Sequence, residues 1–221
     1  MDKLIILLII SAIGSILYSA YRKSLQAKRK KFIDNYQFPQ KITQKICETY
    51  PHLNEQQANE VIGHLREYFH ICHIAGKKMV AMPSQVVDVA WHEHILFTQE
   101  YANFCRKALG RFLHHTPAEA MRSPTRAQKG IKRAWKIACR REKISTTKPS
   151  SLPSLFALDS QLDIPNGFKY ALNCKGSTGS YCATHIGCSS GCASGDSSSD
   201  TDSSDSGCSS SGCSGGCGGG D

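Results

Sequence analysis

The sequence predicts a mainly α-helical protein with an N-terminal transmembrane helix, a compact helical cytosolic domain and a disordered tail. Residues 4–21 carry no charge, and residues 36–172 place apolar side chains at helical spacing between capping signals. From Cys174 onward, 34 of 48 residues are Ser, Gly or Cys, a composition that cannot bury a core. The expected divisions are an anchor at 1–21, a basic juxtamembrane segment at 22–35, the helical domain at 36–172 and the tail at 173–221.

The uncharged run from Leu4 to Tyr21 is just long enough to cross the hydrocarbon core of a bilayer. Six Lys and Arg residues follow it within 22–31, whereas only Lys3 precedes it. The positive-inside rule therefore predicts an inner or plasma membrane protein with its N-terminus outside and the bulk of the chain in the cytoplasm. A cleaved signal peptide is the alternative, but Tyr18-Ser19-Ala20 is a poor cleavage site.

Capping signals and apolar periodicity predict the helices of the domain. A short helix follows Phe38-Pro39, and Asn54 caps a longer one that runs to about His73. Further on, the sequence predicts one helix from Ser84 to Gly110 and a brief one that starts with the capping-box pattern at 116–119. It also predicts a helix from Ser123 to about Lys143, a winding apolar segment at 155–164 and a short strand at 168–172.

The stretch from Pro83 to Pro117 contains four of the nine histidines and organises the predicted domain. On one continuous helix, His94, Tyr101 and Phe104 share a buried stripe, while Asp88 and His92 lie on the opposite side. Asp88 and His92 are four residues apart, so their side chains can touch. Gly110 then lets the chain turn back toward that helix, and His114 and His115 follow it.

Two blocks of this stretch, VDVAWHEHIL from Val87 and GRFLHH from Gly110, resemble the glycine-rich-domain-containing proteins. The similarity covers roughly residues 40 to 150 and includes the D-x-x-W-H-x-H pattern of an uncharacterised bacterial-type member. The resemblance implies no particular reaction.

Asp88 and His92, together with His114 or His115, are the candidate ligands for a metal site. Two histidines and a carboxylate with an open coordination position suit zinc or non-haem iron. The alternative is structural: His94 is a satisfied core histidine beside Tyr101, Asp88 holds His92, and the His114–His115 pair stitches the loop.

The cysteines predict less chemistry. Cys105 falls on the buried stripe and is interpreted as a small apolar residue rather than a nucleophile. Seven of the eleven cysteines lie in the tail, where Cys182, His185, Cys188 and Cys192 form a compact set of soft ligands. Because the predicted topology keeps the tail in the cytosol, a flexible, reduced segment is favoured over disulfides or a metal site.

A basic stripe runs along the predicted helix at 123–143 without an acidic interruption. It is a solvated face, or a surface for anionic lipid or an acidic partner; nucleic acid ranks behind these because the domain is tethered to a membrane. Its members are Arg122, Arg126, Lys129, Arg133, Lys136 and Arg140.

Together these features predict a membrane-anchored cytosolic interaction or scaffold module that could hold a metal ion. A metal-dependent hydrolase or oxygenase that uses Asp88 and His92 with His114 or His115 is the alternative. The sequence does not decide whether the protein is an enzyme.

Overall fold

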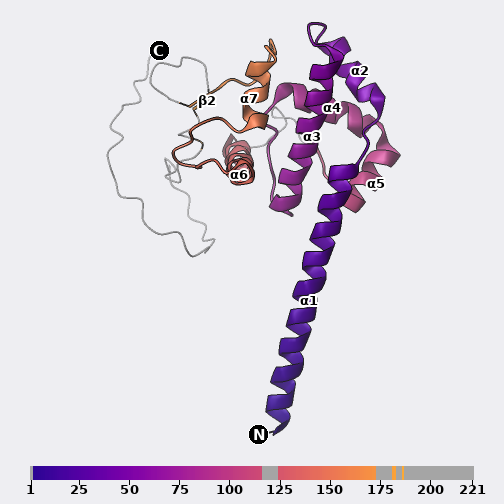
Figure 1. The fold of residues 1–221 in the computed structure, drawn as a ribbon, viewed down its shortest axis with the longest axis vertical. Coiled ribbons are helices and arrows are strands. Elements are labelled where there is room, and N and C mark those ends of the chain that lie inside the picture. Colours follow the sequence, from indigo (N-terminus) through magenta and orange to yellow (C-terminus); the bar gives the residue numbers. More distant parts are fainter. Residues whose placement is uncertain (1, 116–123, 173–180, 183–185, 187–221) are drawn as a thin grey trace. The chain divides into compact units, whose positions relative to one another are not determined.

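The computed structural model describes residues 2–115, 124–172, 181–182 and 186, which confirm a mainly α-helical fold with a long apolar N-terminal helix (Figure 1). The brief helix predicted at 116–119 lies outside the described residues, as does most of the predicted tail. The elements are α1 (Asp2–Asn35), α2 (Gln40–Thr49), α3 (Glu55–Ala75), α4 (Gln85–Leu96), α5 (Thr98–Ala108), α6 (Pro124–Glu142), α7 (Ser154–Gln161), β1 (Tyr170–Ala171) and β2 (Tyr181–Cys182).

Helix α1 is one continuous helix that runs through both the predicted anchor and the predicted basic segment (Figure 1). Its residues Ile5–Asn35 are long and apolar enough to cross a membrane, and none of the most apolar window is buried within the protein. A signal sequence meets the same criterion. At the other end of α1, Ile33 is fully buried and belongs to the hydrophobic core. The core therefore begins before residue 36.

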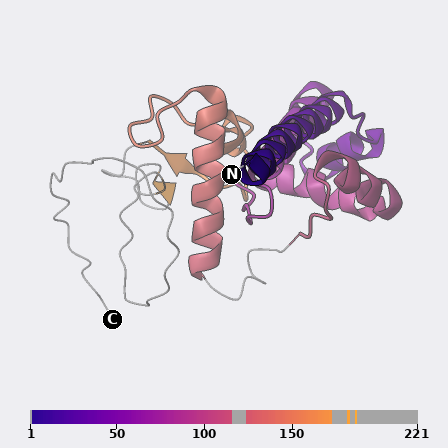
Figure 2. The same cartoon turned by 90° about the horizontal axis from the view of Figure 1, so that it is seen from below.

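Helix α3 is the centre of the domain and packs against α1, α2, α4, α6 and α7. Its apolar side chains Val61, Leu65 and Phe69 are completely buried. The predicted cap is confirmed, because Asn54 Oδ1 accepts from Gln57 N at 2.9 Å and Gln57 Oε1 accepts from Asn54 N at 3.0 Å. Viewed from the side of the chain's N-terminus, α6 runs across the direction of α1 (Figure 2).

The single helix predicted from Ser84 to Gly110 is wrong, because the structure divides it into α4 and α5 at Phe97. Phe97 has a ψ of 62°, outside the helical region. The reason is a long-range hydrogen bond: Trp91 Nε1 donates to the Tyr101 hydroxyl at 3.1 Å. In a continuous helix these residues would be separated by about 15 Å along the axis. The break brings the two side chains together while Tyr101 and Phe104 both stay buried.

A buried carboxylate at the start of α4 connects three separate segments of the chain. Asp159, in α7, accepts hydrogen bonds from Ser84 Oγ and Gln85 N at 2.7 Å and from Phe168 N at 2.8 Å. Val86 N lies 3.3 Å from the same carboxylate. Ser84 also caps α4 by accepting from Val87 N, whereas no local pattern in the sequence indicated the role of Asp159.

The buried contacts of Asp159 predict that even a small substitution at this position causes a large loss of stability. Asp159→Asn keeps the shape but removes the charge and turns an amide NH2 toward groups that themselves donate. We expect the free energy of unfolding to fall by about 2–3 kcal/mol. Urea unfolding of the full chain in detergent, followed by circular dichroism, measures it.

The matched control is Asp163→Asn, which changes an exposed carboxylate four residues away. Asp163 has a φ of 50°, a conformation that Asn tolerates, so this variant should unfold like the wild type. Equal stability of the two variants would show that the Asp159 contacts contribute little.

Candidate metal centre

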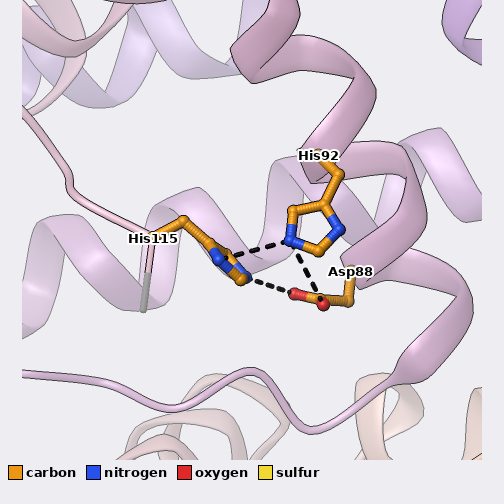
Figure 3. A group of neighbouring side chains, drawn as sticks. All are labelled: Asp88, His92 and His115. Atoms are coloured by element: carbon orange, nitrogen blue, oxygen red, sulfur yellow. Dashed lines mark hydrogen bonds and ion pairs between the residues drawn. The ribbon is translucent and has the colours of Figure 1, made fainter. Parts of the chain in front are cut away.

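The centre is built from two segments that the fold brings together. Asp88 and His92 project from neighbouring turns of α4, and His115 comes from the segment after α5 (Figure 3). Gly110 has a φ of 70°, which favours glycine and lets the chain reverse after α5. The Tyr101 hydroxyl then donates to Leu113 O at 2.6 Å and fixes the returning segment beside α4.

Asp88, His92 and His115 form a closed set of polar contacts (Figure 3). His115 Nε2 lies 2.9 Å from Asp88 Oδ1, and His115 Nδ1 lies 3.2 Å from His92 Nε2. His92 Nε2 is 3.7 Å from Asp88 Oδ2. Because a carboxylate only accepts, a neutral His115 carries its proton on Nε2, and its Nδ1 accepts the proton of His92 Nε2.

The three side chains differ in their access to solvent. His115 and Asp88 are 11% and 19% exposed, whereas His92 is 50% exposed. The ring of the buried Trp91 packs edge-on against His115 at 4.5 Å and holds it in place. Trp91 stands inside the D-x-x-W-H-x-H pattern, but the pattern alone did not indicate that its ring would pack against His115. The result is a half-open site with one face against the core.

One ligand atom from each of Asp88, His92 and His115 can be chosen so that all three lie within 4.8 Å of one another. Tetrahedral zinc, with bonds of about 2 Å, holds its ligand atoms about 3.3 Å apart. The 2.9 Å and 3.2 Å contacts use different nitrogens of the His115 ring, so one ion would require the side chains to turn until one atom from each residue converges on it. A metal ion bound here would replace the protons that the three side chains share.

His114 does not join this group. Its side chain is exposed, and its ring packs against Phe112 at 4.8 Å. Of the two candidate histidines after Gly110, the structure therefore places only His115 beside Asp88 and His92. Successive residues of an extended segment point to opposite sides, so only one of the pair can face α4.

His94 was expected to be a satisfied core histidine, and this is only half correct. It is completely buried, and its ring lies edge-on to Tyr101 at 5.2 Å. Its Nε2 lies 3.3 Å from the Tyr36 hydroxyl, but its Nδ1 has no hydrogen-bond partner among the described residues. Burial lowers the pKa of His94 to about 4, so the ring is neutral at physiological pH.

The other candidate residues lie elsewhere. Cys105 is buried, and burial raises the pKa of its thiol, which disfavours the nucleophilic thiolate. In the basic stripe, Lys129, Lys136 and Arg140 are exposed, whereas Arg133 is half-buried and donates to Met79 O. The side chains of Arg122, Arg126 and the tail ligand set at Cys182, His185, Cys188 and Cys192 lie outside the described part of the chain.

The fold and this centre define a class: a helical protein with one candidate membrane-spanning helix and an Asp/His/His cluster. The chain belongs to the family described as UCP032817-like, which matches residues 28–189. No curated protein and no solved structure matches it. The match does not bear on the resemblance to the glycine-rich-domain-containing proteins, which stays a prediction.

Burial of His94 predicts a loss of stability in acid. The pKa of His94 is about 4 in the folded protein and about 6.5 in an unfolded chain, so the unfolded state binds the proton first. The contribution of His94 to the free energy of unfolding is therefore constant above pH ~6.5. It falls as the pH drops below this value and has decreased by about 3 kcal/mol at pH ~4.

His94→Phe isolates this effect, since it keeps an aromatic ring among the surrounding aromatic side chains but cannot titrate. Urea unfolding of both proteins at neutral pH and at pH ~4 measures the difference. The wild type should lose about 3 kcal/mol more than the variant. A parallel loss in the two proteins would mean that His94 is protonated with its ordinary pKa.

Proposed function

We propose that the protein is a membrane-anchored interaction or scaffold module whose helical domain lies in the cytoplasm and binds a transition-metal ion. The observation that carries the anchoring is the division of α1 between two environments. Its apolar window has no buried residues, whereas Ile33 near its end lies in the core. Exposed Leu and Ile side chains along several turns are costly in water and stable in lipid.

The proposed orientation rests on charge. The six Lys and Arg residues within 22–31 follow the apolar run, so the domain belongs on the cytoplasmic side of an inner or plasma membrane. The free cysteines Cys72, Cys105 and Cys139, all buried, are compatible with a reducing compartment.

The proposed ligands are Asp88, His92 and His115, and the ions that suit them are Zn²⁺ and Fe²⁺. A metal-dependent hydrolase or oxygenase is the second candidate. The half-exposed His92 favours it, because a three-ligand site there leaves a coordination position open to a substrate. A surface cavity of about 380 Å³ lies between α3, α6 and α7 and is lined by none of the three ligands.

The metal proposal predicts a change in zinc content on single substitutions. His92→Ala and His115→Ala each remove one of three ligands, so the Kd for Zn²⁺ should rise at least about 100-fold, more than the loss of an outer-shell partner usually costs. Metal analysis after dialysis of the full chain in detergent against buffered Zn²⁺ measures it.

His114→Ala is the matched control, since it removes the adjacent histidine that points away, and His185→Ala tests the tail. Both should retain wild-type zinc. Loss of zinc in the His114 variant, or full retention in both ligand variants, would refute the site. Zinc binding without turnover of ester or phosphoester test substrates would favour the scaffold over the hydrolase.

The orientation predicts the behaviour of reporters fused to the C-terminus of the full chain in a bacterial host. A fluorescent protein that folds only in the cytoplasm should be bright, and alkaline phosphatase should be inactive. Removing the positive charges at 22–23 and 28–31 should weaken this preference. Active phosphatase on the unaltered chain would reverse the proposed topology.

A further inference from the structure

Helices α1 and α3 pack antiparallel, which determines the end of the domain that lies nearest the apolar part of α1. Arg66 Nη2 donates to Tyr36 O at 2.7 Å, and one turn further along α3, His70 Nε2 lies 2.7 Å from Asp34 Oδ1. Another turn on, Arg29 contributes to lowering the pKa of His73. Each later turn of α3 thus meets an earlier turn of α1, and the C-terminal end of α3 points back along α1 toward its apolar residues (Figure 1).

Basic side chains from two other segments gather at this end. The turn after α3 carries the exposed Lys77 and Lys78, and the end of α5 carries the exposed Arg106 and Lys107. Arg111 joins them, because its Nε donates to Gly76 O at 2.9 Å. We call these five residues, Lys77, Lys78, Arg106, Lys107 and Arg111, the basal face.

The basal face adjoins the basic turns of α1. Lys107 Nζ lies 5.8 Å from the centre of the Phe32 ring. The guanidinium of Arg29 packs directly on Gly110, where it occupies the space that a side chain would fill. Residues 22–33, 73–78 and 106–115 contain no Asp or Glu, so this positive charge is not offset within the three segments.

Two exposed apolar side chains accompany these charges. Ile74, in the last turn of α3, is 53% exposed, and Phe112, next to Arg111, is 46% exposed. Lys and Arg beside exposed aliphatic and aromatic side chains are typical of surfaces that lie at a membrane interface.

The rise of an α-helix sets the height of the basal face above the bilayer core. The apolar run ends at Tyr21, and Arg29 touches Gly110. The distance between Tyr21 and Arg29 along the axis of α1 is about 12 Å. The headgroup layer is about 5–8 Å thick on each side, and electrostatic attraction extends roughly a further 8 Å at physiological salt. The basal face therefore falls within reach of lipid headgroups.

We propose that the basal face binds anionic phospholipid headgroups of the bilayer that α1 crosses, with Ile74 and Phe112 at the interface. This inference rests on the proposed membrane anchoring and extends it, because the whole domain, and not α1 alone, is held on the membrane. The lipid-binding surface is thereby assigned to the ends of α3 and α5, away from the predicted stripe on α6.

The test uses the full chain in nanodiscs of phosphatidylcholine, with or without phosphatidylglycerol. An uncharged acetylating reagent modifies exposed lysines, and mass spectrometry gives the rate at each one. Lys77, Lys78 and Lys107 should react roughly fivefold or more slowly in the anionic discs, since each charge near such a surface contributes about 1 kcal/mol. Lys129 and Lys136 on α6 should react equally in both.

Lys77→Glu with Lys78→Glu should abolish the lipid dependence at Lys107. The matched control, Lys129→Glu with Lys136→Glu, changes the net charge equally and should preserve it. The inference would be overturned if the basal-face lysines were acetylated at equal rates in the two kinds of disc, or if the two double variants changed the lipid dependence at Lys107 equally. It would also be overturned if added RNA protected these lysines to the same extent in neutral discs. A chain that fails to float with the discs would instead refute the anchoring itself.

Discussion

The Asp159 carboxylate at the start of α4 is the interaction on which the centre depends. A buried charge is costly unless several donors satisfy it, and here Ser84, Gln85 and Phe168 do so. The positive end of the α4 dipole adds to the stabilisation. These contacts fix the position and rotation of α4 and therefore the direction in which Asp88 and His92 project. Asp159, which lies 75 residues after Ser84 in the chain, thus helps to place the candidate ligands.

A second constraint brings in the third ligand. Trp91 donates to Tyr101, and Tyr101 donates to Leu113 O, so one phenol links α4 to the segment that carries His115. Both bonds are buried, where hydrogen bonds are strong and costly to lose. They require α4 and α5 to separate at Phe97. The break in the helix and the closeness of His115 to His92 are therefore two consequences of the same hydrogen bonds.

Helix α1 joins its candidate membrane-spanning turns to the domain without a flexible linker. Its apolar turns are exposed, while its last turns supply Ile33 to the core and Asp34 to the buried His70. Arg66 adds two hydrogen bonds to backbone carbonyl groups at the end of this helix and just after it. A division between an anchor and a soluble domain at residue 36 would thus cut through packed structure. Under the proposed anchoring, this continuous helix would hold the domain at a defined height above the bilayer, which is the basis of the proposed basal face.

Local patterns in the sequence determined the helical class, the apolar run, the cap at Asn54 and the pairing of Asp88 with His92. These features depend on residues within one or two turns of each other, and helical periodicity encodes such relations directly. The tertiary structure alone decided the break at Phe97, the burial of Asp159, the lack of a partner for His94 Nδ1 among the described residues and the selection of His115 over His114. Each of these depends on hydrogen bonds or packing between different elements of the fold, and such contacts leave no periodic trace in the sequence.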